Sequence, residues 1–163
     1  MPHQVVKASV KGSTGDLQKI TAALAQVATP TPGQKINILS ISGGEAVIPV
    51  SGGGTQGFGV ISMILDPDDP TTTANVITAL TNLPLGGARH VEHVDAYPLV
   101  HIELANLPGQ LDGAVTAIGD LNILSVHSMG TVVETAHVGL AFDPVDEPTA
   151  RARLTAAGII VHS

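Results

Sequence analysis

The sequence contains no cysteine and no tryptophan, and it has only one tyrosine and two phenylalanines. Without cysteine there is no disulfide framework, no thiol nucleophile and no cysteine-based metal site. With so few aromatic side chains, nucleic-acid binding by base stacking and carbohydrate binding on aromatic platforms are both disfavoured. The core must therefore be built from valine, isoleucine, leucine and alanine.

Positive charge is also scarce, because seven Lys and Arg residues face fourteen Asp and Glu residues and the net charge is −7. The basic residues do not cluster, so the sequence has no positively charged patch of the kind that binds nucleic acid or an anionic membrane. No apolar run approaches the roughly 20 residues that cross a bilayer, and the start "MPHQVVKASVKG" lacks the apolar segment of a signal peptide. We therefore expect a cytoplasmic globular protein with no nucleic-acid and no membrane partner.

What the chain does contain is an internal repeat. Three segments of its first half recur in the same order in its second half. The matches are "VKASVKGSTGDL" (6–17) with "VHIELANLPGQL" (100–111), "INILSI" (36–41) with "LNILSV" (121–126), and "LDPDDP" (65–70) with "FDPVDEP" (142–148).

Each half predicts the order strand, helix, strand, strand, helix, strand. The apolar residues at helical spacing are Leu17, Ile20, Leu24 and Val27, then Val76, Ile77, Leu80 and Leu83, and in the second half Leu111, Val115 and Ile118. We expect residues 89–94 to close the first half and residues 121–126 to form the second strand of the second half. The predicted fold class is α+β, with two ferredoxin-like βαββαβ units, 1–97 and 98–163, each an antiparallel sheet with its helices on one face.

A βαββαβ unit whose first strand ends in "NLPGQL" and whose second strand begins with a hydrophobic residue followed by "NI" resembles the ACT domain, a regulatory module that binds amino acids. The second half matches over most of its length. The first half is a weaker copy, with Gly12 in place of Asn106 and Thr14 in place of Pro108. The resemblance implies a tandem ACT-domain regulatory protein with an amino-acid ligand and a regulated enzyme as a possible partner.

In ACT domains the ligand commonly lies between the first-strand loop of one domain and the second strand of its neighbour. The ligand-binding residues that the resemblance implies are Asn106, Leu107, Pro108, Gly109, Gln110 and Leu111 in the loop, with Asn37 and Asn122 at the second strands.

The loop also has a physical reason to bind a zwitterion. A helix that begins after Gly109 presents free backbone N–H groups and a positive dipole end to a carboxylate. Asn106 can donate and accept hydrogen bonds, although an Asn before Pro-Gly is equally ordinary turn chemistry. At the position that matches Gln110 the first half has Asp16, whose charge would repel a carboxylate. We therefore predict that the 106–111 loop, with Asn37, is the working site and that Asn122 matters little.

The histidines leave an alternative open. Alternation along the strands places His101, Glu103 and His137 on the open face of the second sheet, and His162 can join them from the last strand. This face would serve either as a divalent-metal site or as a protein-interaction surface.

No nucleophile–base pair and no paired carboxylates stand out, so we expect a non-enzymatic protein without a cofactor. The glycine-rich segment at 51–57 lacks the Lys-Ser/Thr of a phosphate-binding loop and is typical of a hairpin loop. Two small sheets covered on one face leave apolar area to bury, so we expect a homodimer or a larger homo-oligomer.

Overall fold

The fold is taken from a computed structural model, which describes residues 4–10, 15–49, 51–53, 55–132 and 134–162. The chain divides into two compact units. We call Val6–Ala96 the N-terminal unit, and Tyr97–Ser163 together with Met1–Val5 the C-terminal unit.

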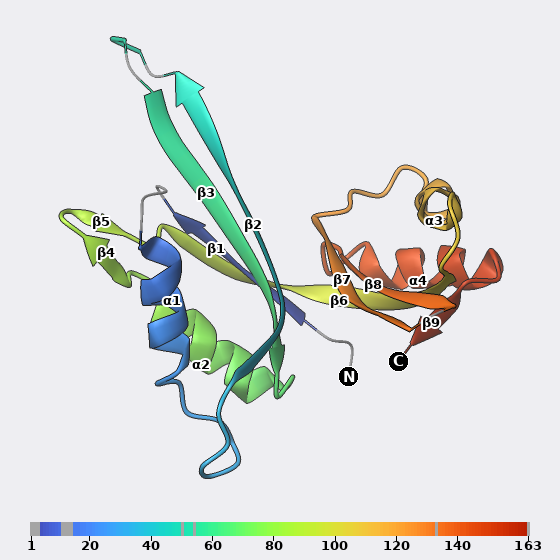
Figure 1. The fold of residues 1–163 in the computed structure, drawn as a ribbon, viewed down its shortest axis with the longest axis horizontal. Helices are drawn as coiled ribbons and strands as arrows, with labels where there is room; N and C mark the ends of the chain where they lie inside the picture. The colour runs from blue at the N-terminus through green and yellow to red at the C-terminus, as the bar shows by residue number, and fades with distance from the viewer. Residues whose placement is uncertain (1–3, 11–14, 50, 54, 133, 163) are drawn as a thin grey trace. The chain divides into compact units, whose positions relative to one another are not determined.

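Two helices and a sheet form the N-terminal unit, together with a small extra hairpin. Its elements are β1 (Gln4–Val10) from Val6 onward, α1 (Asp16–Leu24), β2 (Asn37–Pro49), β3 (Thr55–Asp66), α2 (Pro70–Leu80), β4 (Pro84–Gly86) and β5 (Arg89–His90). The strand order is β2-β3-β1, followed by the beginning of β6 (His93–Ala105). Strands β2 and β3 form a long antiparallel hairpin, visible in Figure 1.

The core of the N-terminal unit lies between this sheet and its two helices. It joins Ile20 and Leu24 of α1 with Val76 and Leu80 of α2. The sheet contributes Val6, Ala8 and Val10 from β1 and Met63 and Leu65 from β3. Helix α2 begins where the Asp69 side chain accepts a hydrogen bond from the Thr72 backbone N–H at 2.9 Å, an ordinary N-terminal cap followed by proline.

The C-terminal unit repeats the same succession of elements. These are the later part of β6, α3 (Gln110–Ile118), β7 (Ser125–Val132), β8 (Thr135–Ala141), α4 (Glu147–Ala156) and β9 (Ile160–His162). Strand β6 pairs antiparallel with β8 on one side and with β9 on the other, and β8 pairs with β7. Residues Val100, Ile102 and Leu104 of β6 pack with Ala114 and Ile118 of α3 and with Ala150 and Leu154 of α4.

The structure is therefore α+β with antiparallel sheets and four helices over the described residues, as the sequence predicts. None of the helices described in the structure is long and apolar enough to cross a membrane.

Two expected strands differ from the prediction. The segment 89–94 is not one strand, because Arg89 belongs to the hairpin of β4 and β5 and the next strand begins at His93. That strand, β6, continues without a break to Ala105. Strand β7 begins at Ser125 rather than at residue 121, since Leu121 and Ile123 pack against the core before the regular ladder starts.

The buried face of two helices agrees with the expected one only in part. Ile20 and Leu24 of α1 and Val27 just after it are buried as predicted, whereas Leu17 is 49% exposed and Asp16 is buried in its place. In α3 the buried residues are Ala114 and Ile118, while Leu111 and Val115 are 43% and 41% exposed. In both helices the buried row has a spacing of four residues, and the leucine one position after the helix start lies beside it.

Candidate functional site

The loop after β6 is the first candidate site. All six residues from Asn106 to Leu111 are exposed. The Asn106 N–H donates to the Glu134 carbonyl at 2.8 Å, and the Gln110 N–H donates to the Leu107 carbonyl at 3.4 Å. The loop is thus held at both ends by its backbone.

Helix α3 begins directly after this loop. Gly109 has φ +84°, a left-handed conformation that glycine adopts without a Cβ penalty, and no side chain caps the helix. The first N–H groups of a helix have no acceptor inside it, so those of Leu111 and Asp112, at the positive end of the dipole, call for an acceptor from outside the helix. This exposed, uncapped helix start is the geometry that a carboxylate needs.

The turn before α1, in the N-terminal unit, has the same glycine conformation as the turn before α3 but differs in the residue that follows the glycine. Gly15 has φ +91° and α1 also lacks a side-chain cap, whereas Gly12 and Thr14 lie outside the described residues. The Asp16 side chain is turned into the unit, where its carboxylate meets the Arg89 guanidinium at 2.9 and 3.2 Å. Asp16 is only 3% exposed.

This ion pair corrects the charge argument drawn from the sequence. The Asp16 carboxylate does not stand at an open helix start, because Arg89, 73 residues away, binds and neutralises it. Helix α3 in turn carries an acidic residue of its own in the first turn, Asp112, which is exposed. Repulsion by Asp16 therefore does not distinguish the two turns, whereas Asn106 still does.

The two asparagines expected at the second strands lie in different settings. Asn37 is the first residue of β2, is exposed and pairs with Asp66 in the ladder. Asn122 is exposed and precedes β7 rather than belonging to it. The expected pairing of Asn37 with the 106–111 loop, and of Asn122 with the matching 12–17 turn, stays a prediction.

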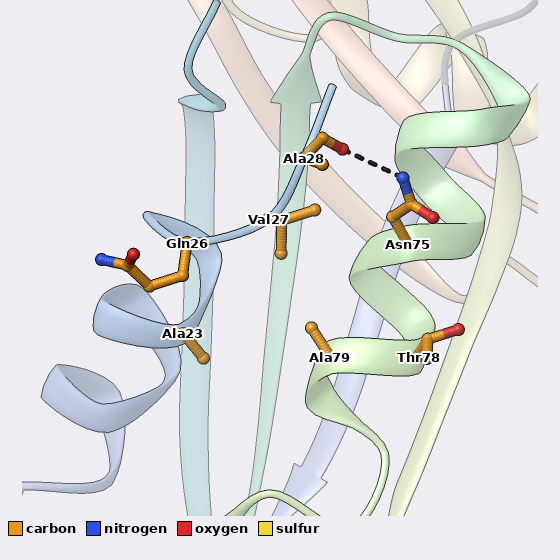
Figure 2. Close-up of a pocket in the computed structure, with 7 residues that line it drawn as sticks. All are labelled: Ala23, Gln26, Val27, Ala28, Asn75, Thr78 and Ala79. Carbon is orange, nitrogen blue, oxygen red and sulfur yellow. Dashed lines mark hydrogen bonds between the residues drawn. The ribbon is translucent and has the colours of Figure 1, made fainter. Parts of the chain in front are cut away.

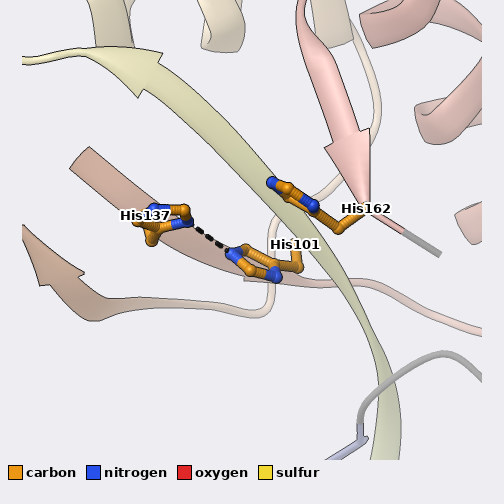
Figure 3. Close-up of side chains that lie close together, drawn as sticks. All are labelled: His101, His137 and His162. Atoms are coloured by element: carbon orange, nitrogen blue, oxygen red, sulfur yellow. Dashed lines mark hydrogen bonds between the residues drawn. The ribbon is translucent and has the colours of Figure 1, made fainter. Parts of the chain in front are cut away.

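A second cluster lies on the sheet of the C-terminal unit. His101, His137 and His162 come from β6, β8 and β9, and one ring nitrogen of each lies within 4.8 Å of the others. His101 Nε2 is 3.0 Å from His137 Nδ1, and the His101 and His162 rings stack at 4.3 Å between centroids. Figure 3 shows the three rings turned toward one another from their three strands.

The sequence does not indicate the shallow hollow between α1 and α2, which is shown in Figure 2. Its lining is Ala23, Gln26, Val27, Ala28, Asn75, Thr78 and Ala79. The Asn75 amide donates to the Ala28 carbonyl at 3.0 Å. The lining contains no titratable side chain, so we assign this hollow to helix packing.

The geometry of the fold has counterparts among solved structures. The ligand-free regulatory subunit of aspartate kinase from Thermus thermophilus aligns with a TM-score of 0.55 at 14% identity, over 96% of this chain and 93% of that one. The chain shares its fold with that regulatory subunit.

Protein BT0572 from Bacteroides thetaiotaomicron aligns with a TM-score of 0.61 at 17% identity, over 99% of this chain and 92% of that one. The aspartate kinase regulatory subunit from Thermus flavus aligns with a TM-score of 0.52 at 14% identity, over 96% and 93%. Neither the protein-family models nor the curated proteins contain a match to the sequence. The likeness therefore establishes the fold, which extends over nearly the whole of both chains.

Proposed function

We propose that this chain is a non-catalytic regulatory protein of the tandem ACT type, which binds an amino acid and passes its occupancy to a regulated enzyme or to its own assembly. The observation that carries the proposal is the exposed, uncapped start of α3 after Gly109. The fold shared with aspartate kinase regulatory subunits supports a regulatory role.

The chemistry of the loop suits a zwitterion better than a simple acid. The uncapped N–H groups and the dipole at the start of α3 favour the carboxylate of the ligand. Asp112, exposed in the same first turn, offers a negative partner for the ammonium group. Asn106 adds a side chain that donates and accepts.

The finer parts of the proposal remain predictions from the sequence. They are the two ACT-like domains, 1–97 and 98–163, a ligand placed at the interface between the domains, and the completion of the site by Asn37. The loop residues Leu107, Pro108 and Gln110 contribute backbone and shape rather than charge.

The test begins with a thermal-shift screen of the amino acids on the full chain, because a ligand that binds only the folded protein stabilises it by about 2.7 kcal/mol at a hundredfold excess over its Kd. The best ligand is then titrated calorimetrically into the wild type, Asn106→Ala and Asn122→Ala. Loss of a hydrogen bond to a charged group costs about 1.5–3 kcal/mol, so we expect Asn106→Ala to weaken binding roughly 10- to 100-fold.

Asn122→Ala is the matched control and should leave the Kd nearly unchanged. The carboxylic acid that lacks the amino group of the best ligand provides a second control, and we expect it to bind more weakly than the amino acid. Equal losses in both variants, or a loss only in Asn122→Ala, would show that the proposed loop is the wrong site.

A further inference from the structure

The geometry points to a divalent transition-metal site on the sheet of the C-terminal unit, formed by His101, His137 and His162. This site does not depend on the amino-acid proposal, because none of its residues belongs to the 106–111 loop.

Strand register brings the three histidines together. In the ladder His101 lies directly opposite His162 on β9, and Glu103 lies opposite His137 on β8. Side chains alternate between the faces of a strand, and Ile102, Val138 and Val161 contact the core under the helices. The histidines therefore share the other face, and β6 places His101 between its two partners.

The spacing of the nitrogens is close to what one ion requires. Two ligands at about 2.0–2.1 Å from a tetrahedral ion lie roughly 3.3 Å apart. His101 Nε2 and His137 Nδ1 are 3.0 Å apart, and all three nitrogens lie within 4.8 Å of one another. Binding one ion with three nitrogens requires the rings to turn, chiefly His162 out of its stack on His101.

The surroundings resemble a metal site in a further respect. Glu103 Oε2 lies 3.2 Å from His162 Nε2, where it can orient that ring as carboxylates commonly do behind metal-bound histidines, or supply an oxygen ligand itself. Leu99 is fully buried two residues before His101 on the same strand face, and it provides an apolar border.

The donor set selects the class of ion. Imidazole nitrogens suit zinc, copper, nickel and iron, whereas calcium and magnesium prefer oxygen ligands. Three protein ligands leave one tetrahedral position for water or for a group from another molecule. Since β9 has only three residues, an ion at this site would also tie the last strand to β6 and β8.

The test titrates zinc sulfate by calorimetry into the full chain after treatment with a chelator. We expect one saturable zinc per chain, and at least a 100-fold weaker Kd in His101→Ala and in His162→Ala. Glu103→Gln should weaken binding about 10- to 100-fold, as loss of an orienting partner does. Cobalt(II) should give the visible absorption of a tetrahedral complex in the wild type but not in His101→Ala or His162→Ala.

His90→Ala is the matched control, because His90 is exposed on β5 in the N-terminal unit. It should bind zinc like the wild type, and magnesium should not compete. His162 lies in the short last strand, so His162→Ala decides the matter if His101→Ala does not fold. Absence of saturable zinc uptake by the wild type, unchanged affinity in His162→Ala, or an equal loss in His90→Ala would overturn the assignment.

Discussion

Asp69 links the stability of α2 to pH. The Thr72 hydroxyl donates a hydrogen bond to its carboxylate and the Thr72 backbone N–H donates another, and these bonds hold the pKa of Asp69 below its ordinary value of 3.8. A carboxyl group whose pKa is lower in the folded than in the unfolded chain stabilises the fold when ionised. Its contribution is complete above pH 3.8 and is lost as the pH falls from 3.8 through the folded pKa.

We expect Asp69→Ala to reduce the free energy of unfolding at pH 7 by about 0.5–2 kcal/mol, the usual cost of losing an N-terminal cap. Asp69→Asn keeps a capping side chain and should cost less at pH 7. Urea unfolding at pH 7 and at pH 3 measures both variants. If Asp69→Asn loses as much stability as the wild type between these two pH values, the carboxylate is not the group responsible.

Asp16 has a different role in the structure from the one that the sequence predicts. In the sequence it is an acidic residue at a helix start, the setting of a solvated charge. In the structure it is buried and bound by both terminal guanidinium nitrogens of Arg89, Nη1 and Nη2. A buried carboxylate is tolerated because a partner satisfies it, and here the partner comes from the hairpin of β4 and β5.

Helices α1 and α3 bury the same side, counted from the residue at which each helix begins. Both begin after a left-handed glycine and bury residues spaced by four, so the leucine one position further on remains outside the core. This pattern distinguishes Leu17 from Ile20. Both are apolar residues of α1 and look equivalent in the sequence, but only Ile20 belongs to the core.

We therefore expect Ile20→Ala to lower the free energy of unfolding by about 2–5 kcal/mol, because Ile20 is fully buried. Leu17→Ala should cost less than about 1 kcal/mol, since nearly half of that side chain is already exposed. Denaturant unfolding of the two variants, which introduce the same residue into the same helix, gives the comparison. Similar losses would show that Leu17 is also part of the core.

At the scale of the whole molecule, apolar side chains exposed outside the two cores favour association between copies of the chain. Leu39 and Ile41 of β2 are 50% and 45% exposed, and β2 is the last strand in the order of its sheet. An edge strand with exposed apolar side chains readily pairs with another chain unless something covers it. This surface supports the expected homodimer or larger homo-oligomer.

Light scattering at high micromolar concentration should give a mass of at least two chains. Ile41→Lys places a charge on β2 and should weaken association at least tenfold. Val145→Lys is the control, because Val145 is 79% exposed in a loop of the C-terminal unit. A wild type that remains monomeric, or equal weakening by both variants, would contradict an assembly through β2.

Features that depend only on near neighbours along the chain could be predicted from the sequence. Alternation and helical spacing predict the α+β class and the succession of strands and helices, because each follows from local geometry. The glycine turns before α1 and α3 are also local, since a left-handed residue and a helix start need only a few adjacent positions. Alternation likewise predicts that His101 and His137 share one face of a sheet.

Contacts between residues far apart in the chain could not be predicted in this way, because they depend on how the elements pack. The sequence does not indicate that Arg89 binds Asp16, or that β9 aligns His162 with His101 rather than with Glu103. A shift of one residue in strand register moves every side chain to the other face, and the register is set by packing of the whole sheet on its helices. The same packing decides which row of α1 is buried, and so it leaves Leu17 outside the core and brings Ile20 into it.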